Sequence, residues 1–167
     1  MNEQFYKTVS QILDDTILVY KELLELYKEK KKVLLTPKNN DLLRIIDEKI
    51  LAQVNTVRRI NEKREEFCNE NEISSTKIST LIELAQKECP EFEKKLSEQK
   101  VKINEVAEEM ALIDKTNVEL IKHGLVMSDK LLDIIISAAG SQKDSYDQHG
   151  KNIEANKITI GSIVEEA

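Results

Sequence analysis

Apolar side chains recur at three- and four-residue steps through most of the chain, the spacing that places them on one face of an α-helix. The first such segment covers residues 2–35, and its stripe holds Phe5, Val9, Ile12, Leu13, Ile17, Tyr20, Leu23, Leu24 and Tyr27. Pro37 ends it, because proline lacks an amide donor and disfavours a helical residue before it. A second stripe covers residues 41–69. The connection of about five residues predicts that the two helices pair as an antiparallel hairpin.

Two further helices are predicted after this hairpin. A short one covers residues 76–87, and a long one covers residues 91–139. Fifty helical residues would span ~75 Å, so we expect a bend or a break in the long segment. Gly124 is the expected weak point, because a glycine in a helix interior costs about 1 kcal/mol relative to alanine.

The composition changes after Gly140, which is suited to cap the end of a helix. We therefore expect one helical bundle domain over residues 1–140 and a flexible tail over residues 141–167. The tail carries a short apolar motif, Ile153, Ile158, Ile160, Ile163 and Val164, among polar residues. One hypothesis is that this motif folds back over an apolar surface of the helices.

Composition supports an all-α fold of the coiled-coil or helix-bundle kind. Of 167 residues, 34% are charged and 4% aromatic, and only 4 glycines and 2 prolines are available for tight turns. Hydrophobic residues make up 40%, which is enough to build a core. Long helices that pack along narrow seams fit these proportions better than sheets do.

The net charge of −6 argues against a nucleic-acid partner, since phosphate binding needs a basic face. The densest basic run, Lys28, Lys30, Lys31 and Lys32, falls in the last turns of the first predicted helix, where cations complement the helix dipole. No apolar run approaches the roughly 20 residues of a membrane span, and no secretory signal is visible. We therefore expect a cytoplasmic protein with no membrane insertion, in which Cys68 and Cys89 are reduced.

The residues that would carry catalysis or bind a cofactor are sparse. His123 and His149 are the two histidines, and Glu119 precedes His123 at a spacing that does not repeat elsewhere. Neither a nucleophile elbow nor a glycine-rich phosphate loop is present. The sequence therefore predicts no catalytic, cofactor-binding or metal-binding residues, and we expect a protein that is not an enzyme.

The end of the long fourth segment has more apolar positions than one helix seam requires. Between residues 120 and 136 they are Leu120, Ile121, Leu125, Val126, Met127, Leu131, Leu132, Ile134, Ile135 and Ile136. One interpretation is that two neighbours bury this stretch, such as the short third helix or a second copy of the chain. The other is a site for a partner helix, which is exposed when empty.

The chain resembles the FlgN family over roughly residues 8–150. The resemblance rests on a leucine-rich first helix (LLELYKEKKKVLL), a break with proline, asparagine and aspartate, and a second helix with DEKILAQVNTVRRINEKREEF. A later helix holds Asn117-Val118-Glu119-Leu120-Ile121 before the leucine and isoleucine stretch. The tail carries Tyr146 and Gly150 in a Tyr-x-x-x-Gly pattern that is similar to the family's end.

The resemblance implies a cytosolic export chaperone. Such proteins bind the C-terminal amphipathic helix of flagellar hook-associated proteins at the hook–filament junction, prevent premature assembly and deliver them to the flagellar type III export apparatus. The partner-binding residues implied here are Asn117, Leu120, Ile121, Leu125, Leu131, Leu132 and Ile135. Asn117 would either form a hydrogen bond across that interface or lie on the solvated face. A different class remains open: a structural coiled-coil scaffold or adaptor without a client, which would form a homodimer through the long C-terminal helix.

Overall fold

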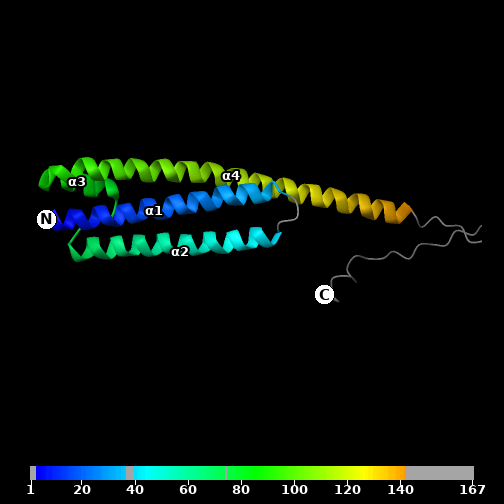
Figure 1. Cartoon of the computed structure of the whole chain (residues 1–167), viewed down its shortest axis with the longest axis horizontal. Coiled ribbons are helices and arrows are strands. Elements are labelled where there is room, and N and C mark those ends of the chain that lie inside the picture. Colours follow the sequence, from blue (N-terminus) through cyan, green and yellow to red (C-terminus); the bar gives the residue numbers. More distant parts are fainter. Residues whose placement is uncertain (1–2, 37–39, 74, 142–167) are drawn as a thin grey trace, which may run out of the picture. The chain divides into compact units, whose positions relative to one another are not determined.

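The chain is built from four α-helices. A computed structural model describes residues 3–36, 40–73 and 75–141, and its helices are α1 (Glu3–Leu34), α2 (Asn40–Glu70), α3 (Ile78–Glu88) and α4 (Pro90–Ser141) (Figure 1). Within this part of the chain no strand is present. The predicted all-α fold is confirmed, and each helix begins and ends within two residues of its predicted position.

The chain divides into two compact units, Met1–Ile121 and Lys122–Ala167. The first unit contains α1, α2, α3 and the larger part of α4. The second unit is described here from Lys122 to Ser141, the remainder of α4. The predicted grouping of residues 1–140 into one domain stays a prediction. The predicted flexible tail, from residue 142 onward, lies outside the described residues.

α1 and α2 pair as an antiparallel hairpin, as the sequence predicts. The Gln53 side chain of α2 donates a hydrogen bond to Glu22 of α1 at 3.0 Å. Nearer the start of α1, the ring of Phe5 stacks on Phe67, with centroids 5.2 Å apart. Contacts that lie earlier in α1 therefore lie later in α2, which is the antiparallel order.

α4 runs parallel to α1 within the first unit. The Gln99 amide nitrogen donates to the carbonyl oxygen of Ser10 at 2.9 Å, and further along both helices the Asn117 amide nitrogen donates to the carbonyl oxygen of Tyr27 at 3.1 Å. In Figure 1, α1 lies beside both α2 and this part of α4. α1 is accordingly the most buried helix, because it has neighbours on two sides.

The core gathers around the first half of α1, where α3 also packs. Leu81 and Ala85 of α3 are fully buried in one cluster with Phe5, Cys68 and Leu96, which come from α1, α2 and α4. Burial of such side chains stabilises the fold by roughly 25 cal/mol for each Å² of apolar area removed from water. Because all four helices contribute, this cluster fixes where α3 lies in the first unit.

The turn after α2 directs the chain into this core. The Ile73 amide donates to the carbonyl oxygen of Cys68 at 3.0 Å, a bond that spans five residues and closes the end of the helix. Glu72, just before it, has φ of 59°, in the left-handed region. The Ile73 side chain is 7% exposed and belongs to the core cluster, so the turn anchors the chain before α3 begins.

α4 is one continuous helix of 52 residues, so the expected break near Gly124 is not found. The cost of a single glycine is about 1 kcal/mol, and the neighbouring leucine, lysine and methionine residues favour a helix. In the part of the chain that the structure describes, no helix is long and apolar enough to cross a membrane.

Candidate functional site

The second half of α4 presents an exposed apolar surface. Every described side chain from Ile121 to Ser137 is exposed. Among its large apolar residues the exposed fraction runs from 37% for Ile121 to 63% for Ile134. Apolar side chains that share one surface in this way mark binding sites far more often than scattered ones do. We call the part of α4 from Leu120 to Ile136 the exposed segment.

The apolar side chains of the exposed segment share one broad face. At about 3.6 residues per turn, they cover more than half of the helix circumference. This face holds Leu120, Ile121, Leu125, Met127, Leu131, Leu132, Ile134, Ile135 and Ile136. The predicted leucines and isoleucines all fall on it. A face this broad exceeds the stripe of an ordinary surface helix and offers apolar area to more than one neighbouring helix.

Two small residues lie in the middle of this face, one helical turn apart. They are Gly124 and Ser128. A side chain built onto Gly124 would meet no atom within 4 Å, so the surface there is open. Small residues at this spacing allow a partner helix to approach the backbone closely, between larger side chains such as Leu131 and Ile135.

Polar residues occupy the opposite side of the exposed segment. They include Lys122, Asp129, Lys130 and Asp133, whose formal charges balance. Val126 is the one large apolar residue of the segment on this side, and 51% of it is exposed. Such an arrangement gives the apolar face a charged border, which is typical of protein–protein interfaces. Charged side chains beside an exposed apolar surface also oppose aggregation.

The structure divides the predicted partner-binding residues into two groups. Leu125, Leu131, Leu132 and Ile135 are more than half exposed and Ile121 is 37% exposed, whereas Leu120 is half-buried. Asn117 is only 1% exposed, and its side chain donates to the Tyr27 carbonyl oxygen at 3.1 Å. Of the two alternatives given for Asn117, the solvated face is therefore wrong, because its side chain attaches α4 to α1 just before the exposed segment.

Three residues on the same face were not among the predicted site residues. Met127, Ile134 and Ile136 are each more than half exposed. The signal that finds them is their position on the helix circumference, since each extends the face formed by the predicted residues. They are therefore as available to a partner as Leu131 is.

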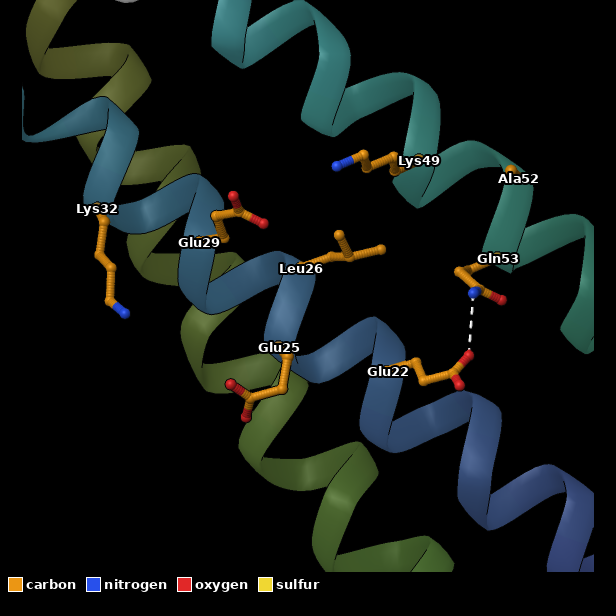
Figure 2. A pocket seen from close by; sticks show the side chains of 8 residues that line it. All are labelled: Glu22, Glu25, Leu26, Glu29, Lys32, Lys49, Ala52 and Gln53. Atoms are coloured by element: carbon orange, nitrogen blue, oxygen red, sulfur yellow. Dashed lines mark hydrogen bonds between the residues drawn. The ribbon is translucent and has the colours of Figure 1, made fainter.

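A different concavity lies between α1 and α2 in the first unit. It has a volume of about 880 Å³, and Figure 2 shows Leu26 of α1 extending toward α2 across it. Its lining is mostly charged, with Glu22, Glu25, Glu29, Lys32 and Lys49 beside Ala52 and Gln53. The Glu22–Gln53 hydrogen bond bridges its end (Figure 2). Negative carboxylates and positive ammonium groups line the same open groove here, as is usual where a seam between two helices faces solvent.

The two cysteines are not joined in a disulfide. Both are free, and Cys68 is fully buried. Burial raises the pKa of the Cys68 thiol, so the reactive thiolate is scarce at neutral pH. Among the described residues, no group of three or more histidine, cysteine, aspartate or glutamate side chains could hold a metal ion.

Comparison with known proteins supports the resemblance seen in the sequence. No curated protein and no solved structure matched the chain significantly. The profile of the FlgN protein family does match, over residues 1–154, which is most of the chain and includes all four helices. The chain therefore belongs to the FlgN family of flagellar export chaperones.

Proposed function

We propose that the exposed segment of α4 binds the C-terminal amphipathic helix of flagellar hook-associated proteins. By covering that helix, the chain prevents premature assembly of these clients at the hook–filament junction. It then delivers them to the flagellar type III export apparatus in the cytoplasm. The observation that carries this proposal is the broad apolar face from Leu120 to Ile136, in a chain of an export-chaperone family.

This role needs no catalytic group. An amphipathic helix is recognised by an apolar groove or face with a polar rim, and its apolar residues dock at helical spacing. Burying one leucine or isoleucine side chain contributes roughly 1.5–3 kcal/mol before the costs of association. Several such side chains from α4 are enough for a micromolar complex, which corresponds to about −8 kcal/mol. The chain is on this proposal a binding protein and not an enzyme.

The experiment is a calorimetric titration with the C-terminal helical peptides of hook-associated proteins from the same genome. We expect stoichiometric binding in the micromolar range or tighter. The double variant Leu131→Asp, Ile135→Asp should lose it, because two carboxylates would be buried against the client. A scrambled peptide controls for composition.

Val126→Asp is the matched control variant. It makes the same kind of change at an exposed apolar position, but on the polar side of the helix. Retained binding in this variant would show that the face, and not the net charge of α4, recognises the client. Absence of binding to every such peptide, together with a stable dimer in sedimentation, would instead indicate the scaffold that dimerises through α4.

A further inference from the structure

Along part of its length the first unit has four helices, and along the rest it has three. Where α3 is present, its Leu81 and Ala85 pack among side chains of α1, α2 and α4. α3 has only 11 residues, whereas α1 has 32 and α2 has 31. Figure 1 shows α3 beside the early part of α1 alone. Further along α1, the first unit therefore consists of α1, α2 and α4 without α3.

This part of the first unit contains an open apolar pocket. It has a volume of about 310 Å³, and its lining includes Tyr20, Leu23, Tyr27, Val54, Val57 and Ala111. These residues come from α1, α2 and α4, the same three helices that share the core cluster with α3. Tyr20 both lines the pocket and packs against the core cluster to which α3 contributes, so the pocket adjoins that cluster. We call it the vacant groove.

The walls of the vacant groove suit a helix. Ala107 and Ala111 lie one turn apart on the α4 wall, and their short side chains leave room for a helix to approach. On the α2 wall, Val54 is 36% exposed although it faces an apolar pocket. A single apolar helix at this position would bury these side chains, as α3 buries those beside it.

The charge in the vacant groove is negative. Asp114 is the one charged residue among those that line it, and no ion pair joins it to another residue of the described part of the chain. The pKa of Tyr27 is raised by burial and by the nearby carboxylates of Asp114 and Asp47. Lys30 forms an ion pair with Asp47 at 2.8 Å, so that of these two carboxylates only Asp114 has no ion pair with a described residue.

We propose that the vacant groove binds an amphipathic helix of a partner protein that carries a lysine or arginine beside its apolar stripe. The apolar stripe would cover Tyr20, Tyr27 and Val54, and the cation would pair with Asp114. A second copy of this chain is the poorer occupant, because each copy carries a net charge of −6. This site is separate from the exposed segment and shares no residue with it, so each can fail without the other.

The test uses two designed helical peptides with the same leucine stripe. One carries a lysine beside the stripe, and the other carries a glutamate at that position. Amide NMR spectra of the full chain, titrated with each peptide, locate the binding residue by residue. We expect the lysine peptide to shift Tyr20, Tyr27, Val57 and Ala111, and to bind about fivefold tighter there than the glutamate peptide, which is the range of a partly exposed ion pair.

Two pairs of variants sharpen the result. Ala111→Trp fills the vacant groove and should abolish these shifts, whereas Ala52→Trp, also at an exposed alanine but in the concavity between α1 and α2, should leave them. Asp114→Lys should reverse the preference toward the glutamate peptide, and Glu105→Lys, on the outer side of α4, should not. The charge reversal decides the matter even if Ala111→Trp does not fold.

Three outcomes would overturn the proposal. Shifts confined to residues from Lys122 onward would show that only the exposed segment binds helices. Shifts at the vacant groove that depend on protein concentration without peptide would identify a second copy as the occupant. A large gain in peptide affinity in the full-length variant Ile158→Asp, Ile160→Asp would show that the chain's own C-terminal segment competes for the groove.

Discussion

Gln99 shows how much of the packing between α1 and α4 depends on one polar side chain. It is 3% exposed, and its amide nitrogen lies within 3.1 Å of three oxygen atoms of α1. These are the Ser10 carbonyl oxygen and hydroxyl, and the Asp14 carboxylate, at 2.6 Å. Because a buried polar group without a partner costs about 1–3 kcal/mol, a donor at this position is required.

Gln99→Glu should therefore destabilise the fold by about 3 kcal/mol at pH 7, since it replaces the donor with a carboxylate that faces oxygen acceptors. The same surroundings would raise the pKa of the new carboxyl group above the ~4.3 of an unfolded chain. The folded state then holds a proton that the unfolded state releases, so the deficit grows as pH rises above ~4.3 and shrinks as pH falls.

Urea unfolding of wild type and variant from pH 4 to pH 7 measures this difference directly. Gln11→Glu is a suitable control, because Gln11 is exposed and its hydrogen bond is to Asp15 on the same helix. A deficit that is independent of pH would contradict the assignment of the Gln99 nitrogen as the donor to α1.

The sequence could predict the apolar positions but not the roles of Gln99 and Asn117. Both are polar residues on a helix rich in charged side chains, where such residues are normally solvated. Nothing in the spacing of residues reveals that α4 lies parallel to α1, and it is this arrangement that places Ser10 against Gln99 and Tyr27 against Asn117. The burial of Asn117 is therefore a property of tertiary packing.

At the scale of the helix, α4 is continuous through Gly124. A glycine in a helix interior has a larger conformational entropy in the unfolded state than alanine. Since nothing lies within 4 Å of the position where a Cβ would be, alanine meets no clash there. Gly124→Ala should therefore stabilise the helix by about 0.5–1 kcal/mol.

The measurement is amide hydrogen exchange of the residues around position 124. It reports the local opening of this helix, which a global unfolding experiment would not separate from unfolding of the core. We expect slower exchange on both sides of the substitution. Ser128→Ala, also on the exposed face, provides the comparison for a smaller gain in helix propensity. Faster exchange in Gly124→Ala would mean that the glycine adopts a backbone conformation other than the helical one.

The helices themselves follow from local sequence patterns. Pro37 and the polar residues around it separate α1 from α2, and the stripe of apolar residues in each explains why they pair. α3 could be predicted as a helix, but its position between the other three could not, because it depends on contacts between residues far apart in sequence such as Leu81 and Phe5. Of the bend or break expected in the long segment, a break at Gly124 is wrong, because one unfavourable residue does not outweigh the favourable ones around it.

At the scale of the molecule, an exposed apolar face should be detectable without any client. A hydrophobic dye such as anilinonaphthalene sulfonate is expected to become fluorescent with the native chain, because several adjacent apolar side chains are more than half exposed. Leu131→Asp with Ile135→Asp should remove most of this signal, while Val126→Asp should leave most of it. A client peptide should displace the dye.

Retention of the dye signal in the double variant, at unchanged stability, would show that the dye reports another surface, such as the vacant groove. The sequence could predict this face almost completely, because the excess of leucine and isoleucine from Leu120 to Ile136 is local. It could not distinguish a buried surface from an exposed one. That distinction depends on which helices pack against which part of α4. α3 packs in the first unit, with residues such as Leu96 of α4.

The exposure of every side chain from Ile121 to Ser137 also has a thermal consequence. A helical stretch whose described side chains are all exposed is stabilised mainly by its backbone hydrogen bonds and its intrinsic propensity, and it melts progressively as temperature rises. On the proposed function, a client helix that binds there would also complete the folding of α4, which releases heat and loses entropy. The affinity for the proposed clients should accordingly decline on warming, well before the core around α1 unfolds. Client binding would then weaken as temperature rises.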